Sequence, residues 1–215
     1  FDTPVLVRLT TRISHTKTVV DVGERPSLSA SFKFEKDPQK YVMVPGFARG
    51  RHVVVENKMS EMRSYSEQLK YNEIDINGEN AFISTGVDYA YAKEALPDFS
   101  SLKLAMTNPF PEKVVRDFIK KFKKVYVIES LDPFLENNIK ILEQEGVEIV
   151  GKDTFPICGE LSVNKIKAAM GLLEEAPSKI DIAIPNRPPA LCKGCSHRKI
   201  FEALRDLNVN VTGDI

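Results

Sequence analysis

Short apolar runs alternate with amphipathic helical segments between residues 81 and 150, and no other feature constrains the fold as strongly. Strands joined through helices run parallel, because each crossover returns the chain to the same end of the sheet. Helices on both sides then bury both faces of that sheet. The pattern therefore predicts an α/β fold with a doubly wound, mostly parallel sheet.

The elements follow from apolar spacing and from turn residues. The expected strands are residues 81–84, 102–106, 125–129 and 147–150, and the expected helices are residues 87–96, 109–122, 132–145 and 161–175. Pro109 and Pro111 stand where proline favours a helix start, and Gly146 stands where glycine favours a helix end. Ser162 is expected to cap the last of these helices.

The flanking segments carry fewer elements. We expect a strand at residues 6–10, a helix at 51–69, a helix at 197–207 and a strand at 209–212. The domain map that follows is 1–20 as the end of one domain, 21–74 as a linker and connecting helix, 75–176 as the α/β domain, 177–190 as a proline-rich linker and 191–215 as the start of another domain. Both ends read as cut from a longer chain.

Composition excludes several classes of partner and location. Lys+Arg and Asp+Glu are both 30, and this balance predicts no nucleic-acid or anionic membrane partner. No apolar run approaches the roughly 20 residues of a membrane span. The three cysteines are too few for a disulfide scaffold and favour a reducing, cytoplasmic location.

The sharpest local motif is Cys192–Lys193–Gly194–Cys195–Ser196–His197, placed before the expected helix 197–207. Two thiolates at this spacing can bind one metal ion or iron–sulfur cluster. A zinc site would need two further ligands, and structural thiols or a redox pair are also consistent with the motif. A covalent haem site is excluded because Ser196 separates the second cysteine from His197.

Polar residues after the expected strands are candidates for ligand binding, since ligands of open parallel sheets bind beyond the carboxyl ends of the strands. Ser84 or Thr85 would present a hydroxyl to an anion, or would cap the next helix, which is the commoner role. Arg12, Ser14 and His15 follow the expected strand 6–10 and are suited to a substrate carboxylate, although ordinary surface polarity explains them equally well.

Several segments together resemble one enzyme family. They are residues 4–15, 41–45, 126–136, 151–162, 187–198 and 213–215. In this order they are similar to alpha subunits of indolepyruvate ferredoxin oxidoreductases, which belong to the 2-oxoacid:ferredoxin oxidoreductases. The likeness covers essentially the whole chain, and the combination is more specific than any single segment.

The resemblance implies a transketolase C-terminal-like domain flanked by partial thiamine-diphosphate-binding domains. It implies oxidative decarboxylation of aryl 2-oxoacids to aryl-acetyl-CoA, with thiamine diphosphate, Mg²⁺ and a 4Fe–4S cluster as cofactors. The implied partners are a beta subunit, ferredoxin and coenzyme A. It also places most cofactor ligands, and the complete catalytic set, outside these residues.

Carried onto this chain, the resemblance places Arg12, Ser14 and His15 near the substrate. Implied cofactor contacts are His197, Gly213 and Asp214, and implied cluster ligands are Cys192 and Cys195. Lys193 and Ser196 stand where the family's pattern leads us to expect proline. The alternative reading is a non-catalytic α/β binding or assembly module with a structural metal site at Cys192 and Cys195.

Overall fold

The computed structural model describes residues 1–25, 35–142, 145–173, 183, 185, 190, 191, 193–207 and 209–212. The chain divides into two units, Phe1–Glu174 and Glu175–Ile215. Five strands and seven helices lie in the described part of the first unit, and helix α8 lies in the second.

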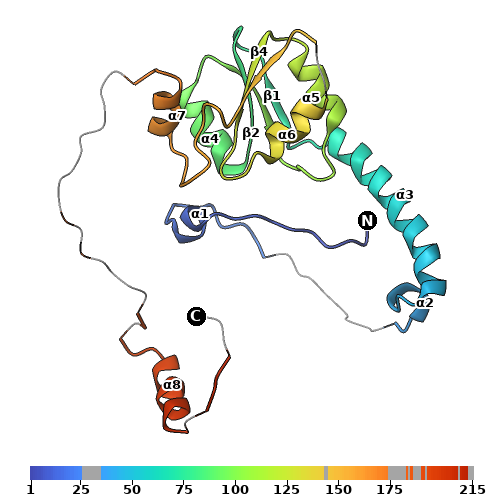
Figure 1. The fold of residues 1–215 in the computed structure, drawn as a ribbon, viewed down its shortest axis with the longest axis vertical. Helices are drawn as coiled ribbons and strands as arrows, with labels where there is room; N and C mark the ends of the chain where they lie inside the picture. The colour runs from blue at the N-terminus through green and yellow to red at the C-terminus, as the bar shows by residue number, and fades with distance from the viewer. Residues whose placement is uncertain are drawn as a thin grey trace. The chain divides into compact units, whose positions relative to one another are not determined.

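The first unit contains a five-stranded sheet (Figure 1). Its strands are β1 (Glu73–Asp75), β2 (Ala81–Thr85), β3 (Ser100–Leu104), β4 (Lys124–Ile128) and β5 (Glu148–Val150). Their order is β1-β3-β2-β4-β5, and all neighbouring pairs are parallel except the β1–β3 pair at one edge. The predicted mostly parallel α/β sheet is confirmed.

Helices cover both faces of this sheet. They are α4 (Gly86–Ala95), α5 (Glu112–Ile119), α6 (Phe134–Ile141) and α7 (Val163–Ala169). One apolar cluster joins the strands to α5 and α6, and a second joins them to α4 and α7. The sheet is therefore doubly wound, as the alternation predicted.

Strand β2 shows why both faces are apolar. Ala81 and Ile83 lie in the cluster under α5 and α6, while Phe82 points into the other cluster. All three side chains are fully buried. Successive strand residues face opposite sides, so a strand buried on both sides needs an uninterrupted apolar run.

Two expected strands are absent, and one strand was not expected. Residues 6–10 form no strand, and Val5, Leu6 and Val7 are exposed. Residues 209–212 form no strand either. A strand needs a neighbouring backbone to pair with, and apolar alternation does not guarantee one. Conversely, β1 pairs with the edge of β3 although its residues carry no clear strand pattern.

Two helices precede the sheet, α2 (Pro38–Tyr41) and α3 (Pro45–Glu67). The predicted helix 51–69 is confirmed up to Glu67, where α3 ends, and α3 begins earlier because Pro45 suits a first helical position. Only Met62 and Ser66 of α3 are buried, so this helix packs near its carboxyl end (Figure 1).

Glu67 fastens α3 to the α/β layer. Its two carboxylate oxygens accept hydrogen bonds from the backbone N–H groups of Lys113 at 2.9 Å and Val114 at 2.8 Å. These donors belong to the first turn of α5, whose N-cap position holds Pro111 without a side-chain cap. Glu67 thus does the work of an N-cap from another helix.

We expect Glu67→Ala to lower the free energy of unfolding by about 1 kcal/mol, the usual effect of losing a helix cap. Denaturant unfolding of the chain, followed by far-ultraviolet circular dichroism, measures the change. The matched control is Glu61→Ala on the exposed side of the same helix. Equal effects of the two substitutions would contradict the capping role.

In the second unit, α8 (His197–Asp206) confirms the predicted helix. Its apolar residues Ile200 and Phe201 are exposed. Among the described residues of the whole chain, no helix combines the length and apolar character needed to cross a membrane.

Candidate functional site

A cavity of about 740 Å³ lies where helix α1 (Thr11–His15) meets α4. This volume is typical of small-molecule sites. The lining residues are Thr10, Thr11, Arg12, His15, Thr16, Val87, Asp88, Tyr91 and Glu160. The wall therefore combines a guanidinium, two carboxylates, three threonine hydroxyls, an imidazole, a valine and a tyrosine.

The cavity lies beside the topological switch point of the sheet. Strands β2 and β4 are neighbours, but β2 leads into α4 on one face and β4 leads into α6 on the other. Their connections diverge and leave a crevice at the carboxyl ends of the strands, where open α/β sheets bind ligands. Val87 and Asp88, just after β2, contribute to the cavity wall.

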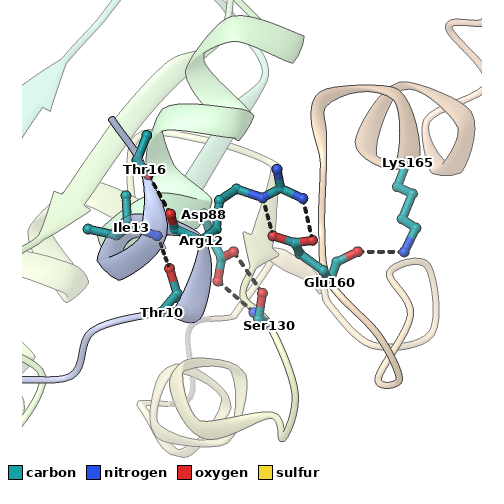
Figure 2. Close-up of polar contacts among 8 residues, drawn as sticks. All are labelled: Thr10, Arg12, Ile13, Thr16, Asp88, Ser130, Glu160 and Lys165. Carbon is teal, nitrogen blue, oxygen red and sulfur yellow. Dashed lines mark hydrogen bonds and ion pairs between the residues drawn. The ribbon is translucent and has the colours of Figure 1, made fainter. Parts of the chain in front are cut away.

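Asp88 bridges the two sides of this crevice. Its carboxylate accepts the backbone N–H of Ser130 and the Ser130 hydroxyl, each at 2.7 Å (Figure 2). Asp88 is only 5% exposed. The contact ties the first turn of α4 to the loop after β4 and fixes the width of the crevice.

Left-handed backbone occurs where β2 passes directly into α4 and in the loop that follows β4. Gly86 has φ 56°, a conformation that glycine adopts freely, and Leu131 has φ 65°. A leucine in this region is disfavoured because its Cβ crowds the backbone. Such conformations cluster at ligand-binding sites, where surrounding contacts hold them in place.

The expected capping role of Thr85 is absent, and the hydroxyls of Ser84 and Thr85 both donate within the sheet. The Ser84 hydroxyl donates to the carbonyl of Ile128 at 2.6 Å, and the Thr85 hydroxyl donates to the carbonyl of Leu104 at 2.6 Å. Thr85 occupies the N-cap position of α4 but makes no side-chain cap. Both hydroxyls instead hold neighbouring strands together at their carboxyl ends.

Arg12 and Glu160 form a two-point ion pair at the rim of the cavity (Figure 2). Arg12 Nε donates to Glu160 Oε1, and Arg12 Nη2 donates to Oε2 at 2.7 Å. The hydrogen bonds and charge of Arg12 hold the pKa of the Glu160 carboxyl below its usual value. The pair joins segments 148 residues apart in the sequence.

The other substrate-proximal candidates lie on the same short helix as Arg12. Thr10 caps α1 by accepting the N–H of Ile13 at 3.4 Å, and the Thr16 hydroxyl donates to the Arg12 carbonyl. His15 lines the cavity beside Arg12, whereas Ser14 is exposed and lies outside the cavity lining.

The cysteine motif belongs to the second unit. Cys195 Sγ lies 3.4 Å from His197 Nδ1. Cys192, Gly213 and Asp214 lie outside the described residues. Within the described part of the chain, no three His, Cys, Asp or Glu side chains gather in a group that would hold a metal ion.

Sequence reasoning missed Asp88 and Tyr91 as cavity residues. An aspartate in a first helical turn is normally interpreted as a favourable partner of the helix dipole. Glu160 belongs to the segment 151–162 of the family resemblance, which assigns no role to it. Nothing local to these residues indicates that they meet α1, so only the packing of distant segments reveals the cavity.

Curated relatives match this chain over nearly its whole length, although no family model matches it. Indolepyruvate oxidoreductase subunit IorA of Methanothermobacter thermautotrophicus is 34% identical over 218 residues, which cover 94% of this chain and 35% of the relative. The Archaeoglobus fulgidus protein of the same name is 31% identical and covers 100% of this chain and 37% of the relative. The Pyrococcus abyssi protein is 32% identical with 94% and 35% coverage. The chain thus spans about a third of the length of these relatives.

Proposed function

Because this chain belongs to the family of indolepyruvate oxidoreductase subunits IorA, we propose that it forms part of an enzyme that oxidatively decarboxylates aryl 2-oxoacids. The observation that carries the proposal is the similarity along nearly the whole chain to relatives of that name. A cavity with a guanidinium at the switch point of the sheet supports it, since a 2-oxoacid brings a carboxylate.

The finer proposal follows the same family. Thiamine diphosphate, when bound, supplies the electron sink for decarboxylation. Arg12 binds the substrate carboxylate, with Ser14 and His15 on the same short helix. We further propose a cytoplasmic location, Mg²⁺ as the diphosphate ligand, coenzyme A as acyl acceptor, ferredoxin as electron acceptor and a beta subunit as partner.

The cluster assignment needs ligands beyond the described residues. Cys195 is one proposed cluster ligand, and its Sγ lies 3.4 Å from Nδ1 of the proposed cofactor contact His197. We propose Cys192 as a further ligand, and His197, Gly213 and Asp214 as cofactor contacts in residues 191–215. We also propose that residues 75–176 form a transketolase C-terminal-like domain between residues 1–20 and 191–215 of the two cofactor-binding domains.

The test is anaerobic purification of the full-length subunit with its beta subunit. We expect ferredoxin reduction that requires coenzyme A and an aryl 2-oxoacid, with indolepyruvate and phenylpyruvate preferred over pyruvate. The visible spectrum and the metal content are recorded on the same preparation. Tightly bound zinc, without thiamine diphosphate and without turnover of any 2-oxoacid, would support the non-catalytic assembly module instead.

A further inference from the structure

The Arg12–Glu160 pair uses only one edge of the guanidinium. Glu160 engages Nε and Nη2, which is the side-on arrangement. The third guanidinium nitrogen, Nη1, points away from the carboxylate (Figure 2). An arginine carries five N–H donors, so the end-on edge can still bind a second carboxylate while the side-on edge is occupied.

Glu160 is held by a fixed backbone. The preceding residue, Gly159, has φ 81°, which few other residues adopt. The carbonyl of Glu160 accepts the Lys165 ammonium at 2.5 Å, and the next residue, Leu161, is 1% exposed within the core. Ser162 then caps α7 by accepting the N–H of Lys165 at 3.3 Å. The Glu160 carboxylate, 51% exposed, is thus presented from backbone that is anchored to the α/β layer.

The Arg12 side chain is less supported, although the Thr10 cap and the Thr16 hydroxyl hold the backbone of α1. No residue of α1 is buried, and the Arg12 side chain is 61% exposed. A long exposed side chain loses conformational entropy when it is fixed on a ligand. Contact with Glu160 removes that freedom before any ligand arrives.

We propose that Glu160 is a positioning residue, which holds the Arg12 guanidinium side-on so that its end-on edge receives the carboxylate of the 2-oxoacid substrate. This inference rests on the proposed function. It adds a role for Glu160, a residue that lies just before α7, far from Arg12 in the sequence. An exposed ion pair contributes little to stability, so its loss affects substrate binding and leaves the fold intact.

The test measures KM and kcat for indolepyruvate in the full-length complex. Glu160→Gln is expected to raise KM about three- to tenfold and to leave kcat unchanged. The reason is that the entropy cost of fixing the Arg12 side chain then opposes substrate binding. Glu160→Asp keeps the charge and restores part of the loss. In a double-mutant cycle with Arg12→Lys, the two effects are expected not to add, because both residues act through one contact.

The matched control is Glu73→Gln. Glu73 on β1 forms an ion pair with Lys103 on β3 at 2.7 Å. Glu73 does not line the cavity. This substitution is expected to leave KM and kcat unchanged.

The sign of the change in KM separates two roles of Glu160. A lower KM in Glu160→Gln would mean that Glu160 competes with the substrate for Arg12, and an unchanged KM would mean that it has no part in binding. Either result overturns the inference. A wild-type complex without turnover of any 2-oxoacid would instead overturn the proposed function. The nuclear magnetic resonance signal of Arg12 Nε–H offers a readout independent of turnover. A sharp signal in the wild type that is lost in Glu160→Gln supports the contact.

Discussion

Replacing Glu129 with alanine is expected to lower the free energy of unfolding of the chain by about 3 kcal/mol, because two buried N–H groups lose their acceptor. The Glu129 carboxylate accepts the N–H groups of Leu135 at 2.8 Å and Glu136 at 2.9 Å. These donors open α6, whose N-cap position holds Pro133 without a side-chain cap. Glu129 is 5% exposed, so water does not readily replace it.

The pH dependence of this contribution has a definite sign. Burial raises the pKa of Glu129 above its usual value, and the two backbone N–H donors offset this only in part. A carboxyl whose pKa is raised on folding stabilises the folded state below its unfolded pKa, which is about 4.3 for glutamate. That stabilisation is lost as the pH rises through the folded pKa. Glu129→Gln removes this titration, so its free energy of unfolding should vary less with pH than that of the wild type.

Three variants test the role of Glu129 by denaturant unfolding, followed by circular dichroism at several pH values. Glu129→Gln keeps one acceptor oxygen and buries no charge, so its loss at pH 7 should be smaller than that of Glu129→Ala. Glu94→Ala, on the exposed surface of α4, is the control and should change little. A loss for Glu129→Ala no greater than that of the control would rule out the capping role.

Removing the carboxylate of Asp88 is expected to cost about 2 kcal/mol and to loosen the crevice at the switch point. A typical intramolecular hydrogen bond contributes roughly 0.5–1.5 kcal/mol net, and Asp88→Ala removes two of them. The backbone N–H and the hydroxyl of Ser130 then lose their acceptor. Denaturant unfolding gives the free energy, and hydrogen exchange at residues 130–132 in the full-length subunit reports the loosening.

Asparagine distinguishes a lost contact from a lost charge at this position. The amide oxygen of Asp88→Asn still accepts the Ser130 N–H, and the Ser130 hydroxyl can rotate to accept the amide N–H instead. We therefore expect Asp88→Asn to recover most of the stability. Ser130→Ala removes only the hydroxyl bond and should cost less than Asp88→Ala. If asparagine were as damaging as alanine, the charge and not the hydrogen bonding would be the important property.

The central part of the fold is predictable because its periodicity is local. In β2 and β4, consecutive apolar residues require burial on both faces, and that requirement already indicates a parallel sheet between helices. Ser162, placed before an apolar helical repeat, correctly marks the start of α7. Arg12 and His15 are candidates by residue type, and both line the cavity.

Local patterns were enough to predict the order of the central strands and helices along the chain, the two buried faces of the sheet and a cation near residue 12. The packing of distant segments was needed to show that β1 pairs with the edge of β3, and that residues 6–10 pair with no strand in the described chain. It also brought Glu160 to Arg12 and Asp88 to Ser130. Periodicity records which side of a segment is buried, whereas edge pairing and polar contacts depend on where distant backbone lies, and no local pattern contains that position.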